Sequence, residues 1–258
     1  MNKSLLLNFS KQDLIDRYSG SILGGAWSFI LPLVNIMIFI LVFSKIMGAK
    51  LALFDVQFSQ YSYSIYLVSG IISWTAFANS VARITNIFKE KAGLIGKVNL
   101  NLVFLPLYIL LTETIIFLIS LVFFAFFLLL LDFPLSWHWL FIPLLFMLQQ
   151  LLAYSLGFIF ASLSVFIKDV REFVGVIMQL WFWCTPIVYV LNIIPEFAQK
   201  IFQLNPMFII ISAYRDIIMF HTIPEASPLF IILIIAIMLL LLSIKIFHTL
   251  EKDIRDII

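Results

Sequence analysis

The sequence predicts an all-α integral membrane protein with six transmembrane helices. Hydrophobic residues make up 63% of the 258 residues and charged residues 12%, whereas soluble domains are about half apolar and a quarter charged. The mean hydropathy is +1.12, and six apolar stretches each reach the roughly 20 residues that cross a bilayer as a helix. The single cysteine, Cys184, excludes a disulfide framework and a thiolate metal site.

The six expected spans are 27–47, 63–84, 102–131, 139–167, 173–192 and 228–247. The third and fourth are long, which permits tilt in the bilayer. Most of the 16 lysines and arginines lie before the first span, between the second and third, between the fourth and fifth, and after the sixth. Because basic residues favour the cytoplasmic side, both termini are predicted to be cytoplasmic.

Residues 1–24 precede the first span and are too charged to cross the membrane. Leu7, Leu14 and Tyr18 fall near one helical face, while charged residues fall elsewhere. This pattern predicts a helix that lies in the membrane interface. A docking surface for a partner protein is an alternative, and the two roles are compatible.

Two compact charged segments are predicted on the cytoplasmic face. Residues 86–97 form an amphipathic stretch that we expect to lie parallel to the membrane, and residues 168–172 read KDVRE. A role in coupling to a partner competes with a simpler interpretation. In that interpretation the charges mark membrane-helix ends and Asp169 caps a helix.

Residues 193–227 follow the fifth span and contain two proline-punctuated apolar pieces. The second piece, 206–220, is about 22 Å long as a helix, which is short of the roughly 30 Å hydrocarbon core. A seventh span would also place the basic C-terminus outside. We therefore expect two short re-entrant helices on the external side, which must be buried in protein or line a cavity.

The sequence gives little support for enzyme chemistry or nucleotide binding. His138, His221 and His248 lie apart, without the spacing of a zinc site. The GLIGKV segment lacks the spacing of a phosphate-binding loop, because Lys97 is followed by valine. Glu113 is a carboxylate inside the third span, for which an inter-helix hydrogen bond is favoured over a proton relay. The net charge of +2 gives no indication of nucleic-acid binding.

Aromatic residues are frequent on the first, second and fifth spans. Many such rings face lipid or form interfacial belts, and the alternative is a pathway lined by rings on which sugars slide. The candidate lining residues are Phe29, Phe39, Trp74, Phe77, Trp181, Phe182 and Tyr189.

The order of these parts resembles a known family. The segments that carry the resemblance are RYSGSILGGAWSFILPL at 17–33, KDVRE at 168–172, TPIVY at 185–189, and LNP with AYRD within 204–216. Together they resemble the permease subunit of type 2 ABC exporters of polysaccharides and polyol phosphates, which include O-antigen, capsule and teichoic-acid exporters. The resemblance covers essentially the whole chain and depends on the order and spacing of the motifs.

The resemblance implies a homodimer in the bacterial cytoplasmic (inner) membrane, bound to two copies of a separate ATPase subunit. ATP and Mg would be held by that ATPase, and this chain would bind no cofactor or metal. The substrate would be a lipid-diphosphate-linked polysaccharide, foremost O-antigen, moving through a continuous aromatic-lined channel in contact with membrane lipid.

The resemblance also implies roles for individual residues. Contacts with the ATPase are expected from Phe88, Lys89, Glu90, Lys91, Lys168, Asp169, Val170, Arg171 and Glu172. The substrate entrance is expected at Arg17, Tyr18 and Trp27, where basic residues including Arg17, Lys168 and Arg171 would meet the diphosphate. The external gate is expected at Pro186, Pro195, Asn205, Pro206, Tyr214 and Arg215.

Other functions stay open from the sequence. An ABC permease of similar architecture would carry a small or lipidic substrate, and a capsule or teichoic-acid exporter would carry another polymer. A membrane-embedded enzyme is disfavoured by the lack of convergent polar groups. A passive channel would lack an associated ATPase.

Overall fold

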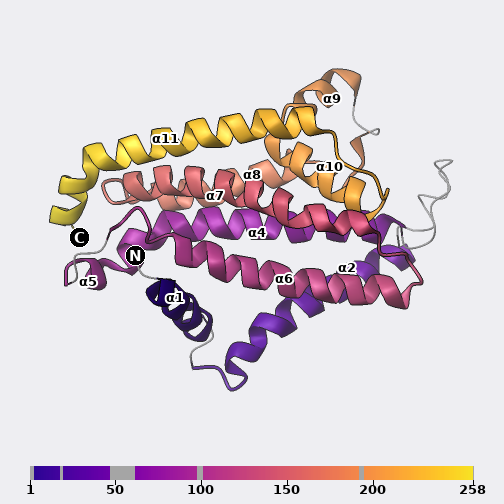
Figure 1. The fold of residues 1–258 in the computed structure, drawn as a ribbon, viewed down its shortest axis with the longest axis horizontal. Helices are drawn as coiled ribbons and strands as arrows, with labels where there is room; N and C mark the ends of the chain where they lie inside the picture. Colours follow the sequence, from indigo (N-terminus) through magenta and orange to yellow (C-terminus); the bar gives the residue numbers. More distant parts are fainter. Residues whose placement is uncertain (1–2, 18–19, 47–61, 98–100, 192–194, 258) are drawn as a thin grey trace.

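The computed structural model describes residues 3–17, 20–46, 62–97, 101–191 and 195–257, and the regular elements in these ranges are helices (Figure 1). Four helical stretches there are long and apolar enough to cross a membrane. They are α4 (Ser62–Glu90), α6 (Leu107–Leu130), Trp137–Ser164 and α11 (Ala226–Ile257). The third combines the 3-10 helix η3 (Trp137–Phe141) with α7 (Ile142–Ser164). The predicted all-α membrane class is therefore confirmed.

Helix α4 lies at the centre of the bundle. It packs against α6, α7, α10 (Pro206–Ile218), α2 (Trp27–Ile46) and α8 (Val170–Trp183), and most extensively against α7. At the crossing of α4 and α7, a Cβ atom added to Gly157 would lie 2.8 Å from the Cβ of Ile84. Small residues let membrane helices approach closely, so Gly157 fixes the distance between these two helices.

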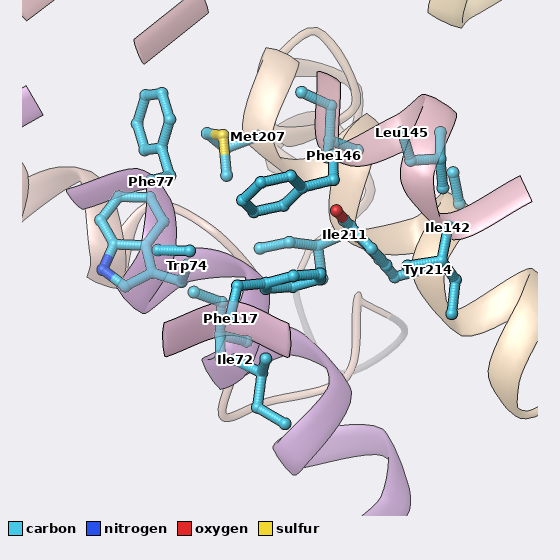
Figure 2. Close-up of a cluster of buried hydrophobic side chains, with 14 of the residues drawn as sticks. Ile72, Trp74, Phe77, Phe117, Ile142, Leu145, Phe146, Met207, Ile211 and Tyr214 are labelled. Atoms are coloured by element: carbon cyan, nitrogen blue, oxygen red, sulfur yellow. The ribbon is translucent and has the colours of Figure 1, made fainter. Parts of the chain in front are cut away.

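The interior contains two apolar clusters. Figure 2 shows part of the larger one, in which Trp74 and Phe77 of α4 lie near Met207 of α10. Phe117 and Phe146 stack there with ring centroids 4.1 Å apart, which joins α6 to α7. The second cluster surrounds three phenylalanines of α4, α7 and α11, namely Phe88, Phe158 and Phe247.

The two ends of the bundle carry different elements (Figure 1). Both chain termini lie at one end, with α1 (Lys3–Asp16) and α5 (Ala92–Ile95). Helices α9 (Glu196–Gln203) and α10 lie at the other end. The elements predicted to couple to a partner are therefore separated along the bundle from the predicted gate helices.

The predicted helix at 86–97 is not a separate element. Helix α4 continues to Glu90, and only the short α5 follows. The reason is that Ile84, Ile87 and Phe88 continue the apolar face of α4 and are fully buried in the second cluster. Helix α11 likewise continues past the predicted end at 247 to Ile257.

The predicted fifth span, 173–192, is wrong in its second half. Helix α8 has 14 residues and ends at Trp183, which makes it about 21 Å long and too short to cross the bilayer alone. The chain from Cys184 to Tyr189 is not helical although it is apolar. Pro186 contributes to this ending, because proline lacks an amide hydrogen and disfavours the helical conformation of the residue before it.

Candidate functional site

The non-helical chain after α8 needs hydrogen-bond partners, because backbone at membrane depth cannot rely on water. We call residues 185–189 the TPIVY segment. Arg215 of α10 donates from Nη1 to the carbonyl of Pro186 at 2.9 Å and from Nη2 to the carbonyl of Ile187 at 3.2 Å. Arg215 is 3% exposed. It therefore acts as a buried clamp on the TPIVY segment.

Two tyrosines of α4 complete the clamp. The hydroxyl of Tyr63 donates to the carbonyl of Val188. One turn further along α4, the hydroxyl of Tyr66 lies 3.3 Å from the Pro186 carbonyl and 3.2 Å from the Tyr189 carbonyl. The carbonyls from Pro186 to Tyr189 thus all have side-chain donors, which explains how an irregular segment is stable between helices.

Gly70 provides the space for the arginine. A Cβ atom at this position of α4 would lie 3.0 Å from Nη2 of Arg215. The guanidinium of an arginine stays protonated in proteins. The clamp is therefore cationic, and its position requires a glycine at residue 70.

Asn205 joins the end of α8 to the start of α10. Its Oδ1 accepts from Trp181 Nε1 at 2.8 Å and from the backbone nitrogen of Met207 at 3.0 Å. Its Nδ2 donates to Thr185 Oγ1 at 2.9 Å and to the Cys184 carbonyl at 3.1 Å. One side chain thus caps α10 and holds both the last turn of α8 and the chain that follows it.

The predicted gate residues fall into different places. Pro186, Asn205 and Arg215 come together around the TPIVY segment. Pro206 is the first residue of α10, and Pro195 is exposed before α9. Tyr214 is buried in the larger apolar cluster instead, with its ring 6.1 Å from that of Phe117 (Figure 2).

A second polar site surrounds Glu113 of α6. Its Oε1 accepts from Arg17 Nη2 at 2.6 Å and from Arg83 Nη1 at 2.8 Å. Arg83 also donates to Asp13 of α1. Two carboxylates and two guanidinium groups therefore form a neutral network that joins α1 to α4 and α6. This arrangement agrees with the predicted inter-helix hydrogen bond of Glu113.

The network borders a cavity of about 210 Å³ between α2, α4 and α6. Arg17 and Glu113 form part of its wall. Polar side chains interrupt the otherwise apolar lining, and these are Ser28 and Asn35 of α2, Thr75 and Asn79 of α4, and Ser120 of α6. Polar groups gathered at the depth of membrane helices are unusual unless they face one another or an aqueous space.

The predicted entrance residues are only partly placed. Arg17 lies in the wall of the cavity, but its charge is already balanced by Glu113. Trp27 begins α2 and is partly buried. Tyr18 lies outside the described residues. The interpretation that Arg17 receives a diphosphate therefore requires the Glu113 ion pair to open.

Four of the seven predicted channel-lining aromatics form one packed group between α4 and α8. Trp181 lies 5.4 Å from Phe77 and 6.2 Å from Trp74 between ring centroids, and Phe182 lies 5.7 Å from Trp74. Trp74 and Phe77 are 7% and 0% exposed. In this conformation these two rings belong to the core of one subunit.

The other three predicted lining residues lie apart from this group. Phe29 of α2 is exposed, whereas Phe39 contributes to the wall of the cavity. The hydroxyl of Tyr189 donates to the carbonyl of Trp183. Of the seven predicted lining residues, Phe39 is thus the one that shares the cavity with Glu113.

The predicted coupling residues are exposed, apart from three. Phe88 is fully buried, Val170 packs against the larger apolar cluster, and Lys91 is partly buried with its ammonium 5.5 Å from the Tyr108 ring. The exposed residues are Lys89, Glu90, Lys168, Asp169, Arg171 and Glu172. Asp169 occupies the N-cap position of α8, but its side chain makes no capping hydrogen bond.

The two charged segments lie near each other. Ser164, the last residue of α7, donates from its Oγ to the carbonyl of Thr85 at 2.8 Å. This bond brings the chain before KDVRE close to the last turns of α4. The exposed charges of both segments therefore belong to one end of the bundle.

Several important residues were not identified as site residues from the sequence. Tyr63 and Tyr66 are not among the residues predicted from the sequence, although their spacing of one helical turn puts both hydroxyls on one face of α4. Arg83 and Asp13 are also not among the predicted site residues, but both belong to the Glu113 network. The position of Arg83 at the end of an apolar stretch could have indicated an ion pair, because charged side chains near membrane depth are usually paired.

Comparison with known proteins defines the class. The model of the ABC-2 type transporter family matches residues 5–219, and the chain therefore belongs to the ABC-2 type transporter family. No group of three or more His, Cys, Asp or Glu side chains in the described ranges has the geometry of a metal site. Family and fold thus indicate the permease subunit of a transporter.

Three relatives match over almost their whole length. The O-antigen export system permease protein RfbA of Myxococcus xanthus is 24% identical over 268 residues, covering 98% of this chain and 95% of that protein. Two proteins of the same name from Klebsiella pneumoniae are 29% and 28% identical, with the same coverage.

Proposed function

We propose that this chain is the permease subunit of an ATP-driven exporter that moves a lipid-linked polysaccharide, the O-antigen, across the bacterial cytoplasmic membrane. The observation that carries the proposal is the similarity to three O-antigen export permeases over 98% of the chain. Two copies form a homodimer. Two copies of a separate ATPase subunit bind ATP and Mg and supply the energy.

In this proposal the chain crosses the membrane six times. Helix α2 has 20 residues, about 30 Å, which suffices for one crossing. Helix α8 crosses together with the TPIVY segment that continues from it. Helices α9 and α10 dip into the membrane from the outside, and both termini are cytoplasmic, as the distribution of basic residues supports.

The ATPase docks at the end of the bundle that carries α1, α5 and the KDVRE residues. The exposure of Lys168, Asp169, Arg171 and Glu172 supports this assignment, because exposed charges at this end of the bundle can contact a partner protein. Lys168 and Arg171 are also exposed and can meet the diphosphate of the arriving substrate, whereas Arg17 is held by Glu113.

The glycan passes between the two subunits along α2 and α8, and α9, α10 and the TPIVY segment form the external gate. The clamp of Arg215 supports the gate assignment, because a segment held by side chains instead of helical hydrogen bonds can change its partners without unwinding a helix. The aromatic residues of α2 and α8 provide surfaces on which sugars pack.

A deletion strain tests the export proposal. Loss of the gene is expected to remove long-chain polysaccharide from the cell surface and to leave lipid-linked glycan inside, and the wild-type gene is expected to restore export. Surface polysaccharide is measured by immunoblot, and the purified permease is examined for an equimolar ATPase. A deletion strain with normal surface polysaccharide would refute the proposal, and an accumulated small lipid would point to the alternative substrate class.

A further inference from the structure

Two residues in the lining of the cavity between α2, α4 and α6 each carry a buried oxygen that lacks a partner in the described part of the chain. Glu113 is 1% exposed and Ser28 is 5% exposed. Neither Glu113 Oε2 nor Ser28 Oγ has a hydrogen-bond partner in the described part of the chain, and both residues line the same cavity. Buried polar atoms in folded proteins are almost always hydrogen-bonded. The two oxygens therefore indicate an occupant that donates hydrogen bonds.

The electrostatics of the wall favour a neutral occupant. The charges of Arg17 and Arg83 are balanced by Glu113 and Asp13 through ion pairs. An anion such as a diphosphate would have to displace a carboxylate from a guanidinium before it could bind. A hydroxyl group, by contrast, can donate to the vacant Oε2 and leave both ion pairs intact, and hydrogen bonds to a carboxylate are among the stronger ones.

The remaining lining also matches a polyhydroxylated ligand. Asn35, Thr75 and Asn79 supply amide and hydroxyl groups that both donate and accept hydrogen bonds. Apolar residues such as Ile36 and Phe117 lie between them and offer surfaces for the C–H faces of a sugar ring. A pyranose likewise presents polar hydroxyl groups and apolar C–H faces, so its surface matches this lining.

We propose that this cavity is a binding subsite for one neutral sugar unit of the exported glycan, in which Glu113 Oε2 and Ser28 Oγ bind ring hydroxyl groups. The volume of about 210 Å³ is far larger than the roughly 30 Å³ of one water molecule. It is also smaller than the roughly 300–1,000 Å³ of pockets for drug-sized ligands. The subsite rests on the proposed export function and adds a place where a single unit of the polymer is recognised.

Cysteine labelling of the full-length permease in complex with its ATPase tests the subsite. Thr75, which is exposed in the cavity wall, is changed to cysteine in a Cys184→Ser background. A small maleimide is expected to label it, and oligosaccharide released from the host's own O-antigen is expected to slow the labelling several-fold. Thr249→Cys, at an exposed position of α11 outside the cavity, is the matched control and is expected to label at one rate throughout.

A second variant and a second probe separate the possible occupants. Adding Ser28→Ala to the Thr75→Cys protein is expected to weaken protection by the oligosaccharide. If labelling is equally fast with and without oligosaccharide, the oligosaccharide does not bind in the cavity and the proposal is overturned. If Thr75→Cys does not react at all, small solutes do not reach the cavity, which also overturns the proposal. Protection by inorganic pyrophosphate but not by oligosaccharide also overturns it, because the occupant is then the lipid diphosphate.

The outcome for the subsite is distinguishable from the outcome for the export function. A deletion strain that loses surface polysaccharide, combined with an unprotected Thr75→Cys, removes the subsite and leaves the export function in place. A deletion strain with normal surface polysaccharide removes both.

Discussion

The guanidinium of Arg215 lies 3.4 Å from the centroid of the Tyr66 ring, and its Nε donates to the backbone carbonyl of the same tyrosine at 3.3 Å. A residue of α4 therefore holds a cation from α10 by its ring and by its backbone. The other partners of Arg215, the carbonyls of Pro186 and Ile187, are also neutral. A cation–π contact gains strength when both groups are removed from water, and this one is buried.

Replacing Arg215 by methionine is expected to destabilise the TPIVY segment. The Ile187 carbonyl would lose its side-chain donor, and an unsatisfied buried group costs about 1–3 kcal/mol. The melting temperature of the purified permease should fall, and proteases should cut the chain after Trp183 faster. Lys200→Met, at an exposed position of the neighbouring α9, is the control and should change neither. Equal melting temperatures for Arg215→Met and wild type would contradict the clamp.

Removing Glu113 is expected to destabilise the attachment of α1. Breaking a buried ion pair costs about 3–5 kcal/mol, and the lower end applies because Arg17 and Arg83 are 23% and 20% exposed. Glu113→Met should therefore unfold more easily than wild type. The double variant Glu113→Met with Arg83→Met should be less destabilised than the sum of the single variants. Additive effects in thermal unfolding would show that the two residues are not coupled.

Gly157→Ala is expected to push α7 away from α4. The added Cβ would lie 2.8 Å from Ile84 Cβ, and overpacking a core typically costs about 1–3 kcal/mol. Ile84→Gly removes both atoms that the new Cβ would meet, the Cβ and Cγ2 of Ile84, so the double variant should be less destabilised than the sum of the two single variants. Gly175→Ala, where the space is open, serves as the control. A Gly157→Ala protein as stable as the control would argue against this packing.

Reversing the charges of KDVRE is expected to separate the permease from its ATPase without unfolding it. Arg171→Glu and Glu172→Lys alter exposed side chains at the start of α8, and exposed substitutions usually change stability by less than about 0.5 kcal/mol. Less ATPase should co-purify, while the melting temperature of the permease stays the same. Unchanged co-purification would place the docking surface elsewhere.

The sequence predicted the long helices well, because an apolar stretch near membrane length has few other structures available. It did not predict where α8 ends, because the residues after Trp183 are as apolar as those before. Their conformation depends on Tyr63, Tyr66 and Arg215, which are distant in the chain. Hydropathy cannot detect partners of this kind.

The same limit of local sequence patterns explains why the prediction and the structure differ at the polar sites. Glu113 was recognised as unusual from its position inside a span, but its partners come from α1 and α4. Phe88 was assigned to an exposed coupling element because charged residues follow it, and the structure buries it. Local charge describes a position along the chain, whereas burial depends on which helices pack there.

The separation of 96 residues between Arg17 and Glu113 has a consequence for the order of assembly during synthesis. Arg83 is made before Glu113, so α6 enters the membrane with a counter-ion already in place on α4. Asp13 of α1 can pair with Arg83 as soon as α4 is made, but the ion pair of Arg17 and the contacts of α1 with α6 form only after α6 has emerged from the ribosome. Nascent chains that stop before Glu113 are therefore expected to leave α1 accessible to proteases, and longer chains are expected to protect it.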